Sequence, residues 1–140
     1  MRCVLDTNVV VAAMRSVNGA SAALLIAARQ GGLTMLANVA LALEYEATCM
    51  LDEHRIAARL SVGDVDLFID AVLAMTEPVE THFIWRPQLR DPADEWVLEA
   101  AVNGRADAIV TFNLRDFGAA PERFGIQLLL PVDALKRIRA

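Results

Sequence analysis

Four acidic residues of this chain stand beside apolar sequence, where a folded protein is expected to bury them at least partly. Asp6 follows an apolar strand-like run, and Glu44 falls on the apolar side of a helical stretch. Asp94 begins the apolar face of another helix, and Asp116 follows a second strand-like run within TFNLRDF. Carboxylates that meet in one crevice repel each other by several kcal/mol unless a cation compensates them. Because oxygen ligands without His or Cys suit Mg²⁺ or Mn²⁺, these acids predict a divalent metal site.

Each acid also has a purely structural interpretation. Asp6 could end a strand and anchor a turn, and Glu44 could pair with a buried arginine such as Arg29. Asp94 could complement the dipole of its own helix, and Asp116 could cap a loop. The combination of all four acids, rather than any one of them, favours the metal site.

Short apolar strands alternate with helices along the chain, which is typical of an α/β protein with parallel strands. The strands are expected within RCVLDTN, LTML, VETHFI, ADAIVT and GIQLL. The helices are expected within residues 18–32, with Asn18 or Ser21 as the cap, and within 38–60, 62–75, 91–104 and 131–140. We therefore predict one domain, residues 1–140, folded as a three-layer α/β/α sandwich around a mostly parallel sheet of about five strands.

The ends of two strands should form the site. Ligands of open α/β sheets bind beyond the carboxyl ends of the strands, where the strand order reverses. Asp6 ends the first strand, and Thr111 and Asn113 follow ADAIVT. If these two strands are neighbours, one crevice collects both ends. Asp91 and Pro92 are expected to begin the helix that carries Asp94.

Composition restricts the class of protein. The net charge of -5 argues against broad electrostatic capture of nucleic acid or membranes, although a bound metal could still recruit an anionic substrate. Cys3 and Cys49 form no metal motif and are expected to be buried and reduced, as in a cytoplasmic protein. Neither a signal peptide nor a membrane span is expected. The apolar segments 20–28 and 67–75 fit dimerisation, a groove for a helix of a partner protein, or ordinary core burial.

Over essentially its whole length, the chain resembles the PIN-domain nucleases, in particular the short VapC-like toxins of bacterial and archaeal toxin–antitoxin pairs. VLDTNV is similar to the opening strand of that family, which carries its first metal-binding acid, here Asp6. NVALALEYEATCML resembles the helix with the second acid, here Glu44. DPADEWVLEAAVNGRADAIVT resembles the segment with the third, here Asp94, and Asp91 recurs as a further acid in one subgroup of PIN-family toxins.

The fourth acidic position departs from the strictest pattern of the family. Many members have Asp two residues after the threonine of VT, where this chain has Asn113. Asp116 follows three residues later. Either residue could fill the fourth position, and the site could hold one metal or two.

The resemblance implies a metal-dependent ribonuclease with Mg²⁺ or Mn²⁺ on Asp6, Glu44, Asp94 and Asp116, an RNA substrate, a cognate antitoxin and a homodimer. Thr7 and Thr111 could orient carboxylates, and Asn8 and Asn113 could contact the metal water or the RNA. Arg90 and Arg115, near acids in sequence, could lie at the rim of the crevice and position phosphate, or could be solvated surface residues. The two histidines, His54 and His82, lie outside every match and are expected to be incidental.

Two other classes of protein stay open. One is a PIN-like domain that binds RNA or a partner without cutting, which Asn113 favours. The other is a phosphoacceptor receiver domain. That class needs two acids at the end of the first strand and a lysine near the last strand, whereas this chain has one acid there and only Lys136.

Overall fold

The computed structural model describes residues 1–82 and 88–140. These residues form one five-stranded sheet, and the four pairings between its neighbouring strands are all parallel. The strand order is β3-β2-β1-β4-β5. The strands are β1 (Arg2–Leu5), β2 (Thr34–Ala37), β3 (Thr76–Pro78), β4 (Ala108–Val110) and β5 (Gln127–Leu129). The helices are α1 (Thr7–Arg15), α2 (Ala20–Arg29), α3 (Val39–Cys49), α4 (Asp52–Ala57), α5 (Val62–Ala74), α6 (Pro92–Asn103), α7 (Leu114–Phe117) and α8 (Pro131–Arg139), with a short 3₁₀ helix η1 (Pro121–Phe124).

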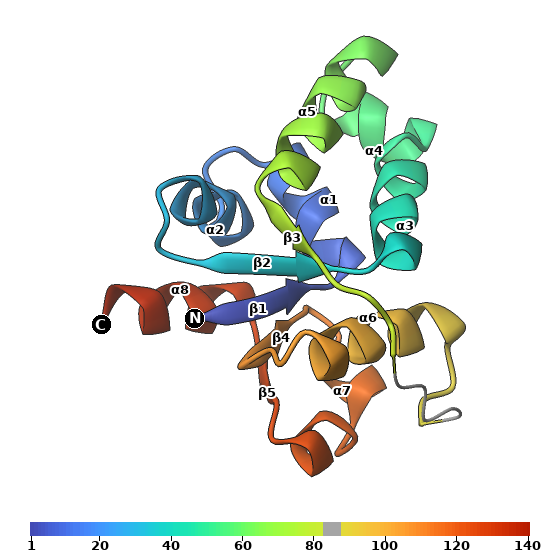
Figure 1. Cartoon of the computed structure of the whole chain (residues 1–140). Helices are drawn as coiled ribbons and strands as arrows, with labels where there is room; N and C mark the ends of the chain where they lie inside the picture. Colours follow the sequence, from blue (N-terminus) through green and yellow to red (C-terminus); the bar gives the residue numbers. More distant parts are fainter. Residues whose placement is uncertain (83–87) are drawn as a thin grey trace.

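Helices cover both faces of the sheet, so the predicted α/β/α sandwich is confirmed. Helix α6 packs on β1, β2 and β4, while α1 and α2 pack against each other on the other side (Figure 1). The central strands are buried on both faces: Val4 in β1 and all of β4 are fully buried. This burial explains why these strands are apolar throughout rather than alternating in polarity.

Strands β1 and β4 are neighbours, with Val4 paired to Ile109 and Leu5 paired to Val110. The chain leaves β1 for β2 on one side and returns to β4 on the other, so the strand order reverses at β1. A crevice at the carboxyl ends of β1 and β4 is therefore expected from the topology. The condition set for a shared crevice, that these two strands are neighbours, is therefore met.

Helix α1 was not predicted, because DTN was interpreted as a turn after the first strand. Asp6 is instead the N-cap of α1, and its Oδ1 accepts a hydrogen bond of 2.8 Å from the backbone N–H of Thr7. The following Val9, Val10 and Val11 have a low intrinsic preference for helix. All three are buried in the core, and that burial outweighs the local preference.

Several predicted boundaries were wrong. The long helix expected over 38–60 is divided into α3 and α4 at Met50 and Leu51, and the N-cap of α2 is Gly19 rather than Asn18 or Ser21. Two short helical segments, α7 and η1, were not predicted.

The strand expected within VETHFI lies earlier, at Thr76–Pro78, and residues 79–82 are outside any strand. Residues 83–84 of that prediction lie outside the described part of the chain. Strand β3 is an edge strand with exposed Glu77 and Pro78, which explains why it lacks an apolar signature. The Glu77 carboxylate accepts from the guanidinium of Arg2 at 2.6 Å.

Both cysteines are free and fully buried, as predicted. Burial raises the pKa of the Cys3 thiol to about 12 and that of Cys49 to about 11. Thiolate chemistry is therefore strongly disfavoured at both positions.

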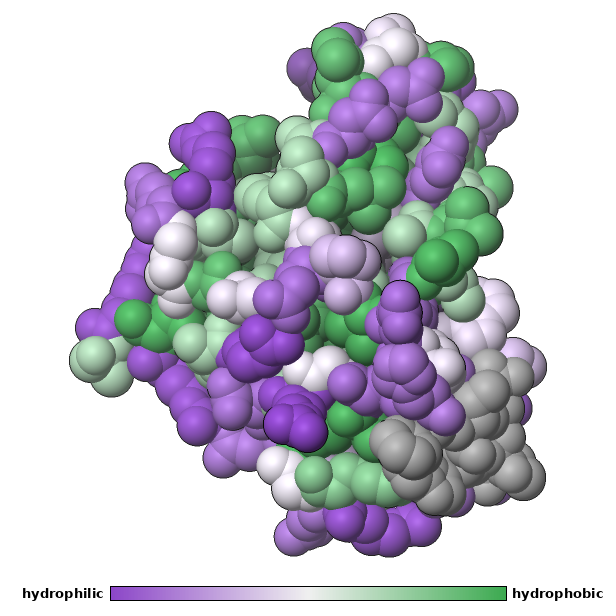
Figure 2. Space-filling model, viewed as in Figure 1, coloured by the Kyte–Doolittle hydropathy of each residue, from purple (hydrophilic) through white to green (hydrophobic). Residues whose placement is uncertain are grey.

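Exposed apolar side chains gather over helices α3, α4 and α5 and the turns between them (Figure 2). Among the described residues, no single helix is long and apolar enough to cross a membrane. The consecutive helices α1 and α2 would reach that length only together, and they meet at 98°. The exposed apolar residues of this surface are Leu43, Leu51, Ile56, Val62 and Leu67.

Candidate active site

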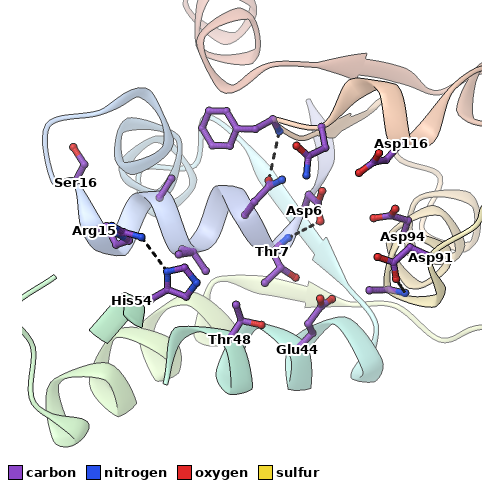
Figure 3. A pocket seen from close by; sticks show the side chains of 16 residues that line it. Asp6, Thr7, Arg15, Ser16, Glu44, Thr48, His54, Asp91, Asp94 and Asp116 are labelled. Carbon is purple, nitrogen blue, oxygen red and sulfur yellow. Dashed lines mark hydrogen bonds between the residues drawn. The ribbon is translucent and has the colours of Figure 1, made fainter. Parts of the chain in front are cut away.

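A cavity of about 610 Å³ opens at the carboxyl ends of β1 and β4, and five carboxylates line it. They come from four separate parts of the chain: the β1–α1 junction, helix α3, the start of α6 and helix α7. Figure 3 shows their side chains pointing toward a common space. The five are Asp6, Glu44, Asp91, Asp94 and Asp116.

Asp6 is the most deeply placed of these acids, with 8% of its surface exposed. The buried Thr111 hydroxyl donates to its Oδ2 at 2.7 Å, and the N–H of Thr7 donates to its Oδ1 at 2.8 Å. Burial raises the pKa of Asp6, and the nearby Asp116 and Asp91 raise it further, while the two hydrogen bonds lower it. Asp6 thus combines the N-cap of α1 with a position in the acidic cavity, whereas the structural alternative considered from sequence was only the anchor of a turn.

Glu44 points from α3 toward the same space as Asp6 (Figure 3). Burial raises the pKa of Glu44, as do the charges of Asp6 and Asp91, whereas the neighbouring Thr7 hydroxyl lowers it. Within the described residues, Glu44 Oε2 and Thr7 Oγ1 are both buried atoms that complete no hydrogen bond. Arg29, the alternative partner for Glu44, is exposed at the end of α2, so this structural interpretation is not supported.

Asp94 lies in the first turn of α6, whose N-cap is Asp91, as predicted. The Asp91 Oδ1 accepts a hydrogen bond of 2.9 Å from the N–H of Ala93. Burial raises the pKa of Asp94 to about 7, and the charges of Asp6, Asp91, Asp116 and Glu44 add to that shift. Carboxylates held this close together are therefore poorly compensated near neutral pH.

Two hydrogen bonds attach helix α3, which carries Glu44, to strand β1 and to helix α6. The Tyr45 hydroxyl, fully buried beside Glu44 in sequence, donates to the Leu5 carbonyl at the end of β1. The Asn38 amide, at the start of α3, donates to the Trp96 carbonyl in α6 at 3.0 Å. Helix α3 is thus fixed to both neighbouring acid-bearing elements.

Polar residues of the VTFN segment, residues 110–113, lie beside the acids of the first cavity. Thr111 Oγ1 also accepts from the Asn113 N–H at 2.9 Å, and Asn8 Oδ1 accepts from the Phe112 N–H at 3.4 Å. Asn113 and Asp116 both line the cavity, so the geometry leaves both candidates for the fourth acidic position in place.

The opposite end of the cavity contains residues that the sequence did not single out (Figure 3). Arg15 Nη1 lies 3.1 Å from His54 Nδ1, and Phe112, 48% exposed, lines the same cavity. His54 is therefore not incidental to the cavity, whereas His82 lies near Glu80, outside it. The apolar run after Asp6 could have revealed Arg15 if it had been interpreted as a helix, because Arg15 is the last residue of α1.

The donor set fits a divalent cation in its chemistry: five carboxylates, no thiol, and a buried Glu44 oxygen without a hydrogen-bond partner among the described residues. Within residues 1–82 and 88–140, no three His, Cys, Asp or Glu side chains are close enough to enclose an ion. Mg²⁺ usually binds through one or two carboxylates and keeps several waters, so such an open arrangement suits it. The four-residue ligand set predicted from sequence stays a prediction.

A second cavity of about 620 Å³ adjoins the first and shares Asp91, Asp94 and Asp116 with it. Arg115, predicted near the site, lines this second cavity rather than the first. Two aromatic residues near the acids in sequence do not face the first cavity: Phe117 is buried in the core, and Trp96 lines a different cavity near Val79.

Replacing Thr111 by Val should raise the pKa of Asp6, because the hydroxyl that donates to Asp6 Oδ2 favours the charged carboxylate. Thr111→Ser is the matched control, since it keeps the hydroxyl and should leave this pKa nearly unchanged. A carboxyl-carbon NMR titration of the metal-free protein measures both. Equal pKa values in the two variants would show that the hydrogen bond does not set the charge of Asp6.

Comparison with known proteins agrees with this architecture. A family model described as a PIN domain matches residues 2–115, a range that includes every acid of the cavity except Asp116. No curated protein and no solved structure matches the chain significantly. Because the family model covers more than half of the chain, the protein belongs to the PIN-domain family, whose members are commonly nucleases.

Proposed function

We propose that this protein is a metal-dependent endoribonuclease, and that it acts as the toxin of a toxin–antitoxin pair of the VapC-like kind. One observation carries the nuclease proposal: five carboxylates face one cavity, and none of them makes an ion pair within the described residues. A fold keeps such a group at a cost in stability, which a bound cation would remove.

Asp6 and Asp94 are the proposed principal ligands, with Glu44 binding directly or through water. A divalent ion held there would polarise the scissile phosphate and lower the pKa of a nearby water. The side chains of the protein would orient the metal-binding carboxylates and accept the proton that the water releases. The Thr111 hydroxyl donates to Asp6 and would fix its direction, and Glu44, whose buried Oε2 has no hydrogen-bond partner among the described residues, would accept a proton from the attacking water.

The toxin role and its partners rest on the resemblance in sequence. An antitoxin would need to cover the acidic cavity or an adjoining surface, and the apolar surface of α3–α5 offers a place for a protein contact. A homodimer could use the same surface. Both proposals need direct measurement of the protein's partners in its own cell.

A PIN-like domain that binds RNA without cutting is the second candidate function. The observation that favours it is Asn113, which lines the cavity where many family members have a carboxylate. A receiver domain is disfavoured, because the acids come from four separate elements rather than from paired strand ends, and Lys136 lies in α8.

Incubating the purified protein with a labelled single-stranded RNA tests the proposal. Cleavage should require Mg²⁺ or Mn²⁺, stop with EDTA and return when the metal is added back. Asp6→Asn is the control, because Asn preserves the cap of α1 while removing the charge. If the wild type and Asp6→Asn, purified in parallel, cleave alike, the activity belongs to a contaminant and the enzyme proposal fails.

A further inference from the structure

We infer that the second cavity, beside the acids, is a phosphate-binding subsite for the RNA strand next to the bond that is cut. The inference rests on the proposed function, since it names where that substrate lies. Three arginines line this cavity together with the three acids it shares with the first. They come from the loop before α6, from α7 and from η1: Arg90, Arg115 and Arg123.

The charges of the two cavities explain why an RNA strand needs this subsite. Among the described residues, the first cavity is lined by five carboxylates and a single arginine, Arg15, at its far end. The second is lined, within the same part of the chain, by three carboxylates and three arginines, so its acidic charge is offset. In a chain of net charge -5, a polyanion gains little attraction from the surface as a whole. A local group of arginines can supply that attraction at the phosphates flanking the metal site.

Two of the three arginines are available to bind. All three are exposed, and within the described residues neither Arg90 nor Arg115 makes an ion pair or a side-chain hydrogen bond. Unpaired guanidinium groups beside the shared acids Asp91 and Asp116 are placed to form bidentate hydrogen bonds with phosphate oxygens. Exposed arginines without partners are common, but two of them beside a third arginine on one cavity adjoining the acids are better explained by a shared ligand.

The third arginine is hydrogen-bonded to Gln88, a residue whose backbone is in turn held by a buried carboxylate. Arg123 Nη1 donates to Gln88 Oε1 at 3.0 Å. Glu95, only 4% exposed, accepts hydrogen bonds from the backbone N–H groups of Gln88 and Leu89, at 2.6 Å and 2.7 Å. Glu95 therefore fixes the segment that begins the wall of the cavity and contacts Arg123 through Gln88. We assign Glu95 as a positioning residue for the subsite.

Single-stranded RNA binding, measured in the Asp6→Asn background, tests the subsite separately from cleavage. The probe is a fluorescein-labelled RNA of about 12 nucleotides, a length within the usual range of single-strand binding sites. Its fluorescence anisotropy is followed with Mg²⁺ present. Arg115→Gln and Arg123→Gln should each weaken binding about fivefold, and each should reduce the slope of log K against log salt by about 0.7. Arg29→Gln is the matched control, since Arg29 is exposed but lines none of the cavities.

The same experiment distinguishes the subsite from the nuclease proposal. The subsite would be overturned if Arg115→Gln and Arg123→Gln bound the RNA with the same affinity as Arg29→Gln. It would also be overturned if no variant bound the RNA. Wild-type cleavage of that RNA is scored independently and decides the nuclease proposal. Unchanged RNA affinity with a loss of binding to a polyglutamate peptide would assign the arginines to an acidic protein segment and would also overturn it.

Glu95 is tested by comparing Glu95→Ala with Glu95→Gln. Gln keeps an oxygen acceptor for the two N–H groups and should restore RNA affinity and the salt slope, whereas Ala should lose both. A purely structural role would change the melting temperature without changing the salt slope. Equal salt slopes for Glu95→Ala and the background protein would overturn the positioning role.

Discussion

Replacing Asp94 by Asn should reduce RNA cleavage by about three orders of magnitude while raising the melting temperature of the metal-free protein at pH 8. The loss of activity follows from removing a proposed metal ligand, because electrostatic stabilisation of several kcal/mol corresponds to roughly that factor. The gain in stability follows from the neighbouring acids. Burial and the charges of Asp6, Asp91, Asp116 and Glu44 oppose ionisation of Asp94 in the folded chain.

Asp133→Asn is a closely matched control for Asp94→Asn. Asp133 stands in the first turn of α8, two residues after a proline, as Asp94 does in α6, but it is exposed and lies on neither acidic cavity. Its removal should lower stability slightly, by about 0.3–1 kcal/mol through loss of a favourable helix-dipole contact, and should leave cleavage unchanged. Differential scanning fluorimetry and cleavage rates measure both variants. A lower melting temperature for metal-free Asp94→Asn than for the wild type would contradict the repulsion described here.

The metal-free protein should lose stability as the pH rises from 5 to 7, and then level off. The folded state raises the pKa of Asp94 from 3.8 to about 7, so between these values the folded chain holds a proton that the unfolded chain has released. Raising the pH toward 7 removes that proton from the folded chain, which lowers the free energy of unfolding. The raised pKa values of Asp6 and Glu44 act in the same direction.

Melting temperatures measured in EDTA between pH 5 and 8 test this prediction. The lowered pKa values of Asp64 and Glu77 affect stability only at more acidic pH, so this range reports mainly on the acidic cavity. Mg²⁺ should raise the melting temperature more at pH 8 than at pH 6, because protons and the ion compete for the same carboxylates. An Asp94→Asn variant with the full wild-type slope would show that the pH dependence arises elsewhere.

The layer architecture was predictable because parallel strands buried on both faces have an unmistakable apolar composition. The meeting of Asp6 with Thr111 was expected only if β1 and β4 were neighbours, a condition that the structure meets and that the sequence alone could not establish. Helix α1 was missed because three consecutive valines favour a strand locally, and only tertiary burial makes them helical. Strand β3 was misplaced because an edge strand needs no apolar face.

The acids of the site could be predicted, but most of its basic residues could not. A carboxylate beside apolar sequence is conspicuous, whereas Arg15, His54 and Arg123 have no such signal, and Arg115 was expected near the site only because it precedes Asp116. Only the fold places Arg15 on the first cavity and Arg115 on the second. The role of Glu95 was equally hidden, because its partners are backbone N–H groups with no sequence signature.

The double attachment of Asp6, to the first turn of α1 and to Thr111, has an evolutionary consequence. A descendant that abandons RNA hydrolysis still needs a side chain that caps α1, so selection for folding alone can preserve Asp or Asn at position 6. Asp94 is under no such protection, because Asp91 already caps α6 and a neutral residue at 94 relieves repulsion. When sequences of this kind are surveyed, the identity of residue 94 should therefore separate active from degenerate copies better than that of residue 6.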